Sequence, residues 1–212
     1  MISRKKIIIF DFDGVLNNSF DELHKMHVFV CSHFDREISA VEYSNLFLNS
    51  NFHGNLEKLL ALEPRKLEEF KVLKYSVFDN YYSRTKLYDF AEEMVKKIQL
   101  AGYDHMAIVS SAPKIQIEKI LEMNGLRSSF FEILGINKNG KAGVVESLVE
   151  SLKLQPSDCY FITDTVGDII DGKCVGVKML AVTWGFHDKI KLNAAEPEYV
   201  VDNPQEILDI LV

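Results

Sequence analysis

Acidic and hydroxyl side chains end three apolar segments of this sequence: Asp11 with Asp13, Ser110 with Ser111, and Asp164, which Asp168 follows by one helical turn. Two carboxylates about 4 Å apart in a partly desolvated site repel each other by roughly 4 kcal/mol. A group of such acids therefore needs a positive counter-charge, and its oxygens suit a hard divalent cation such as Mg²⁺. Together with Lys141, serine hydroxyls and backbone N–H groups, a cation of this kind would bind a phosphoryl group.

The apolar segments that carry these residues are typical of buried strands in a parallel sheet, because both faces of such a sheet are covered. We predict strands at residues 5–12, 105–110, 131–134, 159–163, 177–182 and 199–201. The spacing of apolar residues predicts helices at residues 88–100, 113–123, 142–152 and 204–211. Strands that alternate with helices indicate an α/β sandwich, in which ligands bind beyond the carboxyl ends of the strands.

One stretch interrupts this alternation. Residues 17–84 contain helical patterns and no convincing strand. Ser19 with Glu22 matches the capping box that begins a helix, and Pro64 suits the first turn of another. The stretch is too long for an ordinary loop between a strand and a helix. The predicted division of the chain is an α/β core at residues 1–16 and 85–212 and an inserted helical cap domain at residues 17–84.

The composition argues against several classes of protein. A net charge of −7 argues against a broad basic surface for nucleic acid. No apolar run is long enough to span a bilayer and no secretory stretch follows the amino terminus, so we expect a cytoplasmic protein without a membrane partner. The three cysteines are widely separated, which indicates reduced core thiols. Both a monomer and a homodimer are compatible with the sequence.

The order of these motifs resembles that of the haloacid dehalogenase (HAD)-like hydrolase superfamily. The four motifs of that family are similar to Asp11-Phe12-Asp13-Gly14-Val15-Leu16, to Ser110, to Lys141 and to Asp164-Thr165-Val166-Gly167-Asp168. The inserted stretch follows the first motif, as the cap of the phosphoglycolate phosphatase-like subgroup does. The resemblance covers nearly the whole chain and implies a Rossmann-like three-layer α/β sandwich with a parallel sheet and an all-α cap.

The resemblance also implies a role for each motif residue. Asp11 would be the nucleophile that accepts the phosphoryl group, and Asp13 would protonate the leaving alcohol and then activate water. Dehalogenases of the family lack an acid two residues after the nucleophile, because a halide leaving group needs no proton, so Asp13 indicates phosphate esters. The residues that would bind the phosphate oxygens are Ser110, Ser111 and Lys141, with Lys138 as the less favoured alternative to Lys141.

Mg²⁺ is the cofactor that the resemblance implies. Its ligands would be Asp11, the backbone carbonyl of Asp13, and Asp164, with Asp168 as a direct or supporting ligand. The expected function is hydrolysis of a small phosphorylated metabolite through an aspartyl-phosphate intermediate, with phosphoglycolate as the default substrate class. The alternatives are a phosphosugar mutase of the same family, similar to β-phosphoglucomutase, and a non-enzymatic phospho-acceptor or binding protein.

The inserted stretch offers further polar residues that the sequence does not rank. The candidates for binding the leaving group of the substrate are Arg36, Arg65, Lys74 and Arg84. Phe78, Tyr81 and Tyr82 have helical spacing and are interpreted as packing inside the cap or against the core. His24 and His27 are expected on a helix surface, because their spacing fits no tight metal-ligand pattern.

Overall fold

The computed structural model describes residues 6–103, 105–137 and 139–211 of the chain. Within these residues a six-stranded parallel sheet is formed by β1 (Ile7–Phe10), β4 (Met106–Ser110), β5 (Glu132–Gly135), β6 (Cys159–Thr163), β7 (Lys178–Val182) and β8 (Tyr199–Val201). Their order across the sheet is β5-β4-β1-β6-β7-β8. The strand order therefore reverses at β1, and ligands bind at such a switch point in open α/β sheets.

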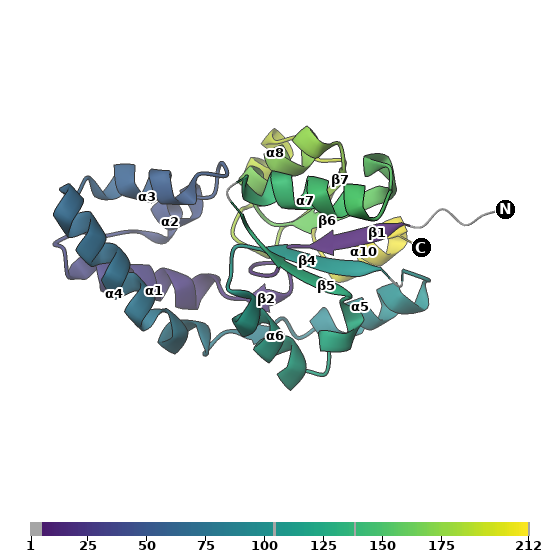
Figure 1. Cartoon of the computed structure of the whole chain (residues 1–212), viewed down its shortest axis with the longest axis horizontal. Helices are drawn as coiled ribbons and strands as arrows, with labels where there is room; N and C mark the ends of the chain where they lie inside the picture. Colours follow the sequence, from purple (N-terminus) through teal and green to yellow (C-terminus); the bar gives the residue numbers. More distant parts are fainter. Residues whose placement is uncertain (1–5, 104, 138, 212) are drawn as a thin grey trace.

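Two layers of helices cover the faces of this sheet (Figure 1). One layer consists of α5 (Ala91–Leu100), α6 (Lys114–Met123) and α10 (Pro204–Leu211), and the other of α7 (Gly140–Ser151), α8 (Val166–Val175) and α9 (Lys189–Ala194). Short 3-10 helices at Arg127–Ser129 and Pro156–Asp158 precede β5 and β6. The predicted three-layer α/β sandwich is confirmed.

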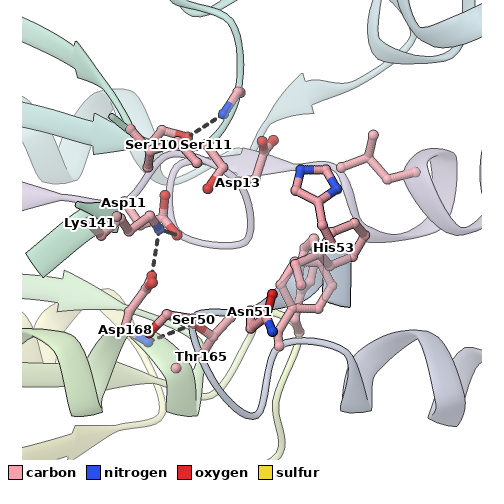
Figure 2. Close-up of a pocket in the computed structure, with 18 of the residues that line it drawn as sticks. Asp11, Asp13, Ser50, Asn51, His53, Ser110, Ser111, Lys141, Thr165 and Asp168 are labelled. Atoms are coloured by element: carbon pink, nitrogen blue, oxygen red, sulfur yellow. Dashed lines mark hydrogen bonds and ion pairs between the residues drawn. The ribbon is translucent and has the colours of Figure 1, made fainter. Parts of the chain in front are cut away.

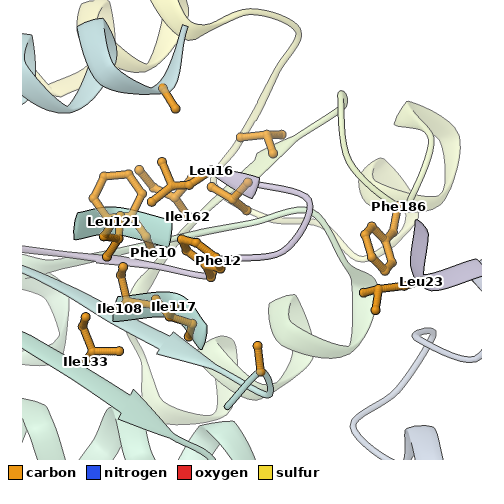
Figure 3. Close-up of a cluster of buried hydrophobic side chains, with 14 of the residues drawn as sticks. Phe10, Phe12, Leu16, Leu23, Ile108, Ile117, Leu121, Ile133, Ile162 and Phe186 are labelled. Atoms are coloured by element: carbon orange, nitrogen blue, oxygen red, sulfur yellow. The ribbon is translucent and has the colours of Figure 1, made fainter. Parts of the chain in front are cut away.

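The alternation of side chains along β1 divides the core between these layers. Ile8 and Phe10 belong to the cluster on the α5, α6 and α10 side, whereas Ile7 and Ile9 belong to the cluster under α7 and α8. Figure 3 shows the first cluster, with Phe10 among buried side chains that include Ile117 of α6. Among the described residues, no helix combines the length and the apolar character that a membrane span requires.

Helices α1 (Phe20–Ser32), α2 (Ala40–Asn45), α3 (Phe52–Leu60) and α4 (Pro64–Tyr82) form a separate lobe beside the sheet (Figure 1). We call this lobe, residues 20–82, the cap. A short antiparallel ribbon connects it to the core and pairs β2 (Asn17–Asn18) with β3 (Lys86–Leu87). The predicted domain boundaries at residues 17 and 84 lie next to this ribbon, and the division itself stays a prediction.

The structure differs from the sequence predictions at several places. Strand β2 lies in the stretch predicted to be free of strands. The prediction missed it because two residues are too few to form a recognisable hydrophobic pattern. Ser19 begins α1, but its hydroxyl accepts no capping hydrogen bond, and Glu22 pairs with Lys25 at 2.7 Å instead of forming a capping box. His27 is buried rather than exposed. Cys174 is exposed, so only the other two cysteines are core thiols.

Candidate active site

A cavity of about 330 Å³ lies between the cap and the carboxyl ends of the central strands (Figure 2). The predicted residues in its wall are Asp11, Asp13, Ser110, Ser111, Lys141 and Asp168. They meet because their strands are neighbours: Phe10 of β1 pairs with Ile108 of β4 on one side and with Ile162 of β6 on the other. A cavity of this size suits a small metabolite.

Lys141 joins two acids of the core. Its Nζ lies 2.7 Å from Asp11 Oδ2 and 2.6 Å from Asp168 Oδ2, and all three residues are buried. Burial alone would lower the pKa of Lys141, but the attraction of Asp11 and Asp168 raises it above its ordinary value. The lysine is therefore protonated, which is the form that contact with a phosphate oxygen would require. The alternative, Lys138, lies outside the described residues.

Asp11 faces Lys141 from the end of β1. Its Oδ1 accepts a hydrogen bond from the backbone N–H of Phe12 at 2.7 Å. Burial raises the pKa of Asp11 well above its ordinary value, and the charge of Lys141 offsets this only in part. The carboxyl group is thus short of positive charge, which a bound cation would supply.

Asp13 is held by two side-chain donors. Asn17 Nδ2 donates to its Oδ1 at 2.8 Å, and the Tyr82 hydroxyl lies 3.1 Å from both carboxyl oxygens. Burial raises the pKa of Asp13, and these donors lower it in part. Tyr82 belongs to the last turn of α4, so the cap itself positions the predicted general acid. Helical spacing indicates only that Tyr82 is buried, and its polar contact becomes visible in the folded chain.

Asp164 is fully buried and, unlike the other predicted acids, is not part of the cavity wall. The backbone N–H of Phe186 donates to its Oδ2 at 2.7 Å, while Oδ1 has no hydrogen-bond partner among the described residues. Burial raises its pKa to about 7, although the Phe186 N–H lowers it in part. A Cβ atom at Gly14 or Gly185 would collide with this carboxyl group, so both glycines make room for Asp164.

These residues fit a divalent cation. Asp11 and Asp164 are buried carboxyl groups whose pKa values are raised by burial, and Asp164 Oδ1 is an unpaired oxygen within the described chain. In the described part of the chain, no three Asp, Glu, His or Cys side chains are grouped so that they hold a metal ion by themselves. The backbone carbonyl of Asp13 and water would have to complete the ligands, and Mg²⁺ usually keeps several waters. Asp168 is engaged by Lys141, which favours a supporting role for it.

Thr163 positions Asp168, a role that the sequence pattern does not indicate. Its Oγ1 donates to Asp168 Oδ2 at 2.8 Å, and this same oxygen contacts Lys141. We expect Thr163→Val, which removes the donor, to lower kcat/KM roughly tenfold, because a buried hydrogen bond to a charged group is lost. Thr163→Ser should keep most of the activity. Steady-state kinetics would check this, and an equal loss in both variants would show that packing matters rather than the hydroxyl.

The cap and the core also touch away from Asp13. Gln116 of α6 donates to Asp79 of α4 at 2.8 Å. His187 Nδ1 accepts from the backbone N–H of Val166, so its Nε2–H donates to the carbonyl of Ser44 in α2 at 2.9 Å. These contacts join residues far apart in the sequence and hold the cap over the strand ends.

The chain thus combines a parallel α/β core with acids, serines and a lysine that gather at its strand ends beneath a helical cap. The sequence pattern of haloacid dehalogenase-like hydrolases matches residues 8–182. This chain belongs to the haloacid dehalogenase-like hydrolase family.

Named relatives extend over the whole chain at low identity. A phosphoglycolate phosphatase from Vibrio vulnificus is 24% identical over an alignment of 225 positions. The alignment covers 98% of this chain and 96% of that protein. The pyrophosphatase PpaX from Bacillus cereus is 24% identical over an alignment of 219 positions. The alignment covers 98% of this chain and 97% of that protein. A haloacid dehalogenase-like family hydrolase from Streptococcus pneumoniae has a similar structure, with a TM-score of 0.83, 20% identity and 100% coverage of both chains.

Proposed function

We propose that this protein is a Mg²⁺-dependent phosphatase that hydrolyses a small phosphomonoester through an aspartyl phosphate on Asp11. The observation that carries the proposal is the convergence of Asp11, Asp13 and Lys141 in one cavity that residues of the core and the cap line together. Membership of a hydrolase family and relatives named as phosphatases support it. The proposal keeps the predicted cytoplasmic location and a small-molecule substrate, without a nucleic-acid or membrane partner.

In the first step, the Asp11 carboxylate forms a bond to phosphorus while the ester P–O bond breaks. The leaving alkoxide takes a proton from Asp13, whose pKa is raised by burial, so that a neutral alcohol departs. Lys141 and the Ser110 hydroxyl would stabilise the charge on the non-bridging oxygens. Lys141 Nζ is already 2.7 Å from the attacking carboxyl group and therefore close to the transferred phosphoryl group.

In the second step, water attacks the phosphorus of the aspartyl phosphate, and Asp13, now ionised, takes a proton from that water. The acyl phosphate bond breaks, and inorganic phosphate and the Asp11 carboxylate are released. Tyr82 and Asn17 donate hydrogen bonds to the Asp13 carboxyl group, which stabilises the ionised form that this step requires. Mg²⁺ held by Asp11, Asp164 and the Asp13 carbonyl would neutralise the charge of the phosphoryl group.

A screen of small phosphorylated metabolites for released phosphate tests this function. We expect at least one phosphomonoester to be hydrolysed in the presence of Mg²⁺. EDTA should abolish the activity because buried carboxylates without a cation cannot accept a phosphate dianion, and added Mg²⁺ should restore it. Full activity in EDTA would contradict the metal dependence. Formation of a sugar bisphosphate instead of free phosphate would favour the mutase, and binding without any turnover would favour the non-enzymatic alternative.

A further inference from the structure

The four candidate cations for binding the leaving group differ sharply in their surroundings. Arg36, Arg65 and Arg84 are exposed, and each donates a hydrogen bond to a residue of the cap. Lys74 is only 7% exposed and lies in the wall of the cavity. The structure therefore distinguishes Lys74, which is buried in the cavity wall, from three exposed arginines that the sequence does not rank apart from it.

Lys74 has no counter-charge within the described part of the protein. No hydrogen bond or ion pair connects it to any residue that the structure describes. Its Nζ lies 4.9 Å from the ring centroid of Tyr75 and 5.9 Å from that of Phe52, so its surroundings are largely aromatic. Burial and the nearby charge of Lys71 lower its pKa. A buried ammonium group without an acidic partner is costly, and such groups gather at sites where a ligand supplies the missing charge.

Helix α4 connects Lys74 to the place where the leaving group departs. Lys74, Phe78 and Tyr82 are spaced by four residues, and all three line the cavity. Residues at this spacing form one stripe on a helix, and the rise of 1.5 Å per residue places Lys74 about 12 Å from Tyr82 along the axis. Because the Tyr82 hydroxyl contacts Asp13, the stripe runs from the proposed general acid toward the cap end of the cavity.

The acids of the cavity wall all lie on the core side, whereas a cation without an acidic partner among the described residues lies on the cap side. The acids are Asp11, Asp13, Asp168 and Asp171, and Lys141 of the core already contacts Asp11 and Asp168. The cap contributes Lys74 together with histidines, and Figure 2 shows His53 across the cavity from Asp11 and Lys141. Burial and the charge of Lys74 lower the pKa of His53, which favours the neutral imidazole, and a neutral imidazole can donate one hydrogen bond to an anion. The cap end of the cavity thus suits a negative charge.

We propose that Lys74 binds a second anionic group, a carboxylate or a phosphate, at the far end of the leaving group. A substrate such as phosphoglycolate carries a second anion of this kind, and Lys74 is the residue that would recognise it. This inference rests on the proposed function, which places the phosphoryl group at Asp11. Lys74 would be a specificity residue, because it contacts the part of the substrate that does not react.

Two ligands that the enzyme cannot hydrolyse, one with and one without a second anion, measure how much that anion contributes to binding. Phosphonopropionate carries a phosphonate and a carboxylate joined by two methylene groups, and propylphosphonate has a methyl group in place of the carboxylate. Calorimetric titration in the presence of Mg²⁺ should show at least about tenfold tighter binding of phosphonopropionate to the unchanged protein. Lys74→Met should abolish this preference and leave the affinity for propylphosphonate within about threefold. Lys66→Met, an exposed lysine on the same helix, serves as the matched control.

Equal binding of both ligands to the unchanged protein, or a full preference in Lys74→Met, would overturn the inference. Lys74→Gln provides a second neutral variant if the methionine variant does not fold. Ethylenediphosphonate has a second phosphonate in place of the carboxylate, so its affinity shows which anion Lys74 prefers. Tight binding of phosphonopropionate or of ethylenediphosphonate that is lost in Lys74→Met supports the inference. The titration involves no turnover, so a protein that keeps the preference but releases no phosphate would refute only the proposed hydrolysis.

Discussion

Asp11→Asn is expected to lower kcat by more than about a thousandfold. The amide keeps the size of the side chain but offers no carboxylate to attack phosphorus, and no other described acid stands at the same place beside Lys141 at the end of β1. The fold should survive, because the substituted amide would still fill the same buried space at the carboxyl end of the strand. Phosphate release under saturating substrate and Mg²⁺ measures the effect.

The matched control for this variant is Asp209→Asn, an exposed aspartate on α10 outside the cavity wall. Its kcat should stay within about twofold of the unchanged protein, since surface substitutions of this kind rarely matter. Circular dichroism would show that both variants are folded. Asp11→Asn with more than a tenth of the original kcat would exclude Asp11 as the covalent nucleophile.

The sheet could be predicted from the sequence because its strands are buried on both faces. Strands β6 and β8 match the predicted residues 159–163 and 199–201, since a continuous apolar run has clear limits. The first strand is shorter than the predicted 5–12: it ends at Phe10, before the acids, and residue 5 lies outside the described residues. Parallel strands bring their carboxyl ends to one edge, so the meeting of Asp11, Asp13 and Ser110 also follows from the pattern.

The rest of the site could not be predicted, because it depends on contacts between residues distant in the sequence. Helical spacing shows that Tyr82 is buried, but not that its hydroxyl reaches Asp13 across 69 residues. Thr163 reads as an ordinary strand residue until its hydroxyl is seen to contact Asp168. Lys74 and Arg84 look alike as cap cations, and only the fold buries the first and exposes the second. Periodicity predicts which side chains are inside, whereas their polar partners depend on the tertiary structure.

Asp13→Asn is expected to lower kcat about a hundredfold to ten-thousandfold for an alkyl phosphate, because both proposed steps use this carboxyl group. The amide can still contact Tyr82 and Asn17, which hold Asp13 now, so the loss would reflect proton transfer rather than misplacement. The magnitude should depend on the leaving group. A nitrophenolate departs without a proton, so the first step should be nearly normal with nitrophenyl phosphate, whereas the second still lacks its base.

This difference gives a kinetic signature for the dual role of Asp13. Rapid mixing of Asp13→Asn with nitrophenyl phosphate and Mg²⁺ should release a burst of nitrophenolate close to one equivalent of enzyme, followed by a slow steady rate. Mass spectrometry of the quenched protein should find the phosphoryl group on Asp11. The Asp209→Asn control should turn over without a burst of this size. If the variant lost equal activity toward both esters and showed no burst, proton transfer by Asp13 would be excluded in both steps, and its hydrogen bond from Tyr82 would need another explanation.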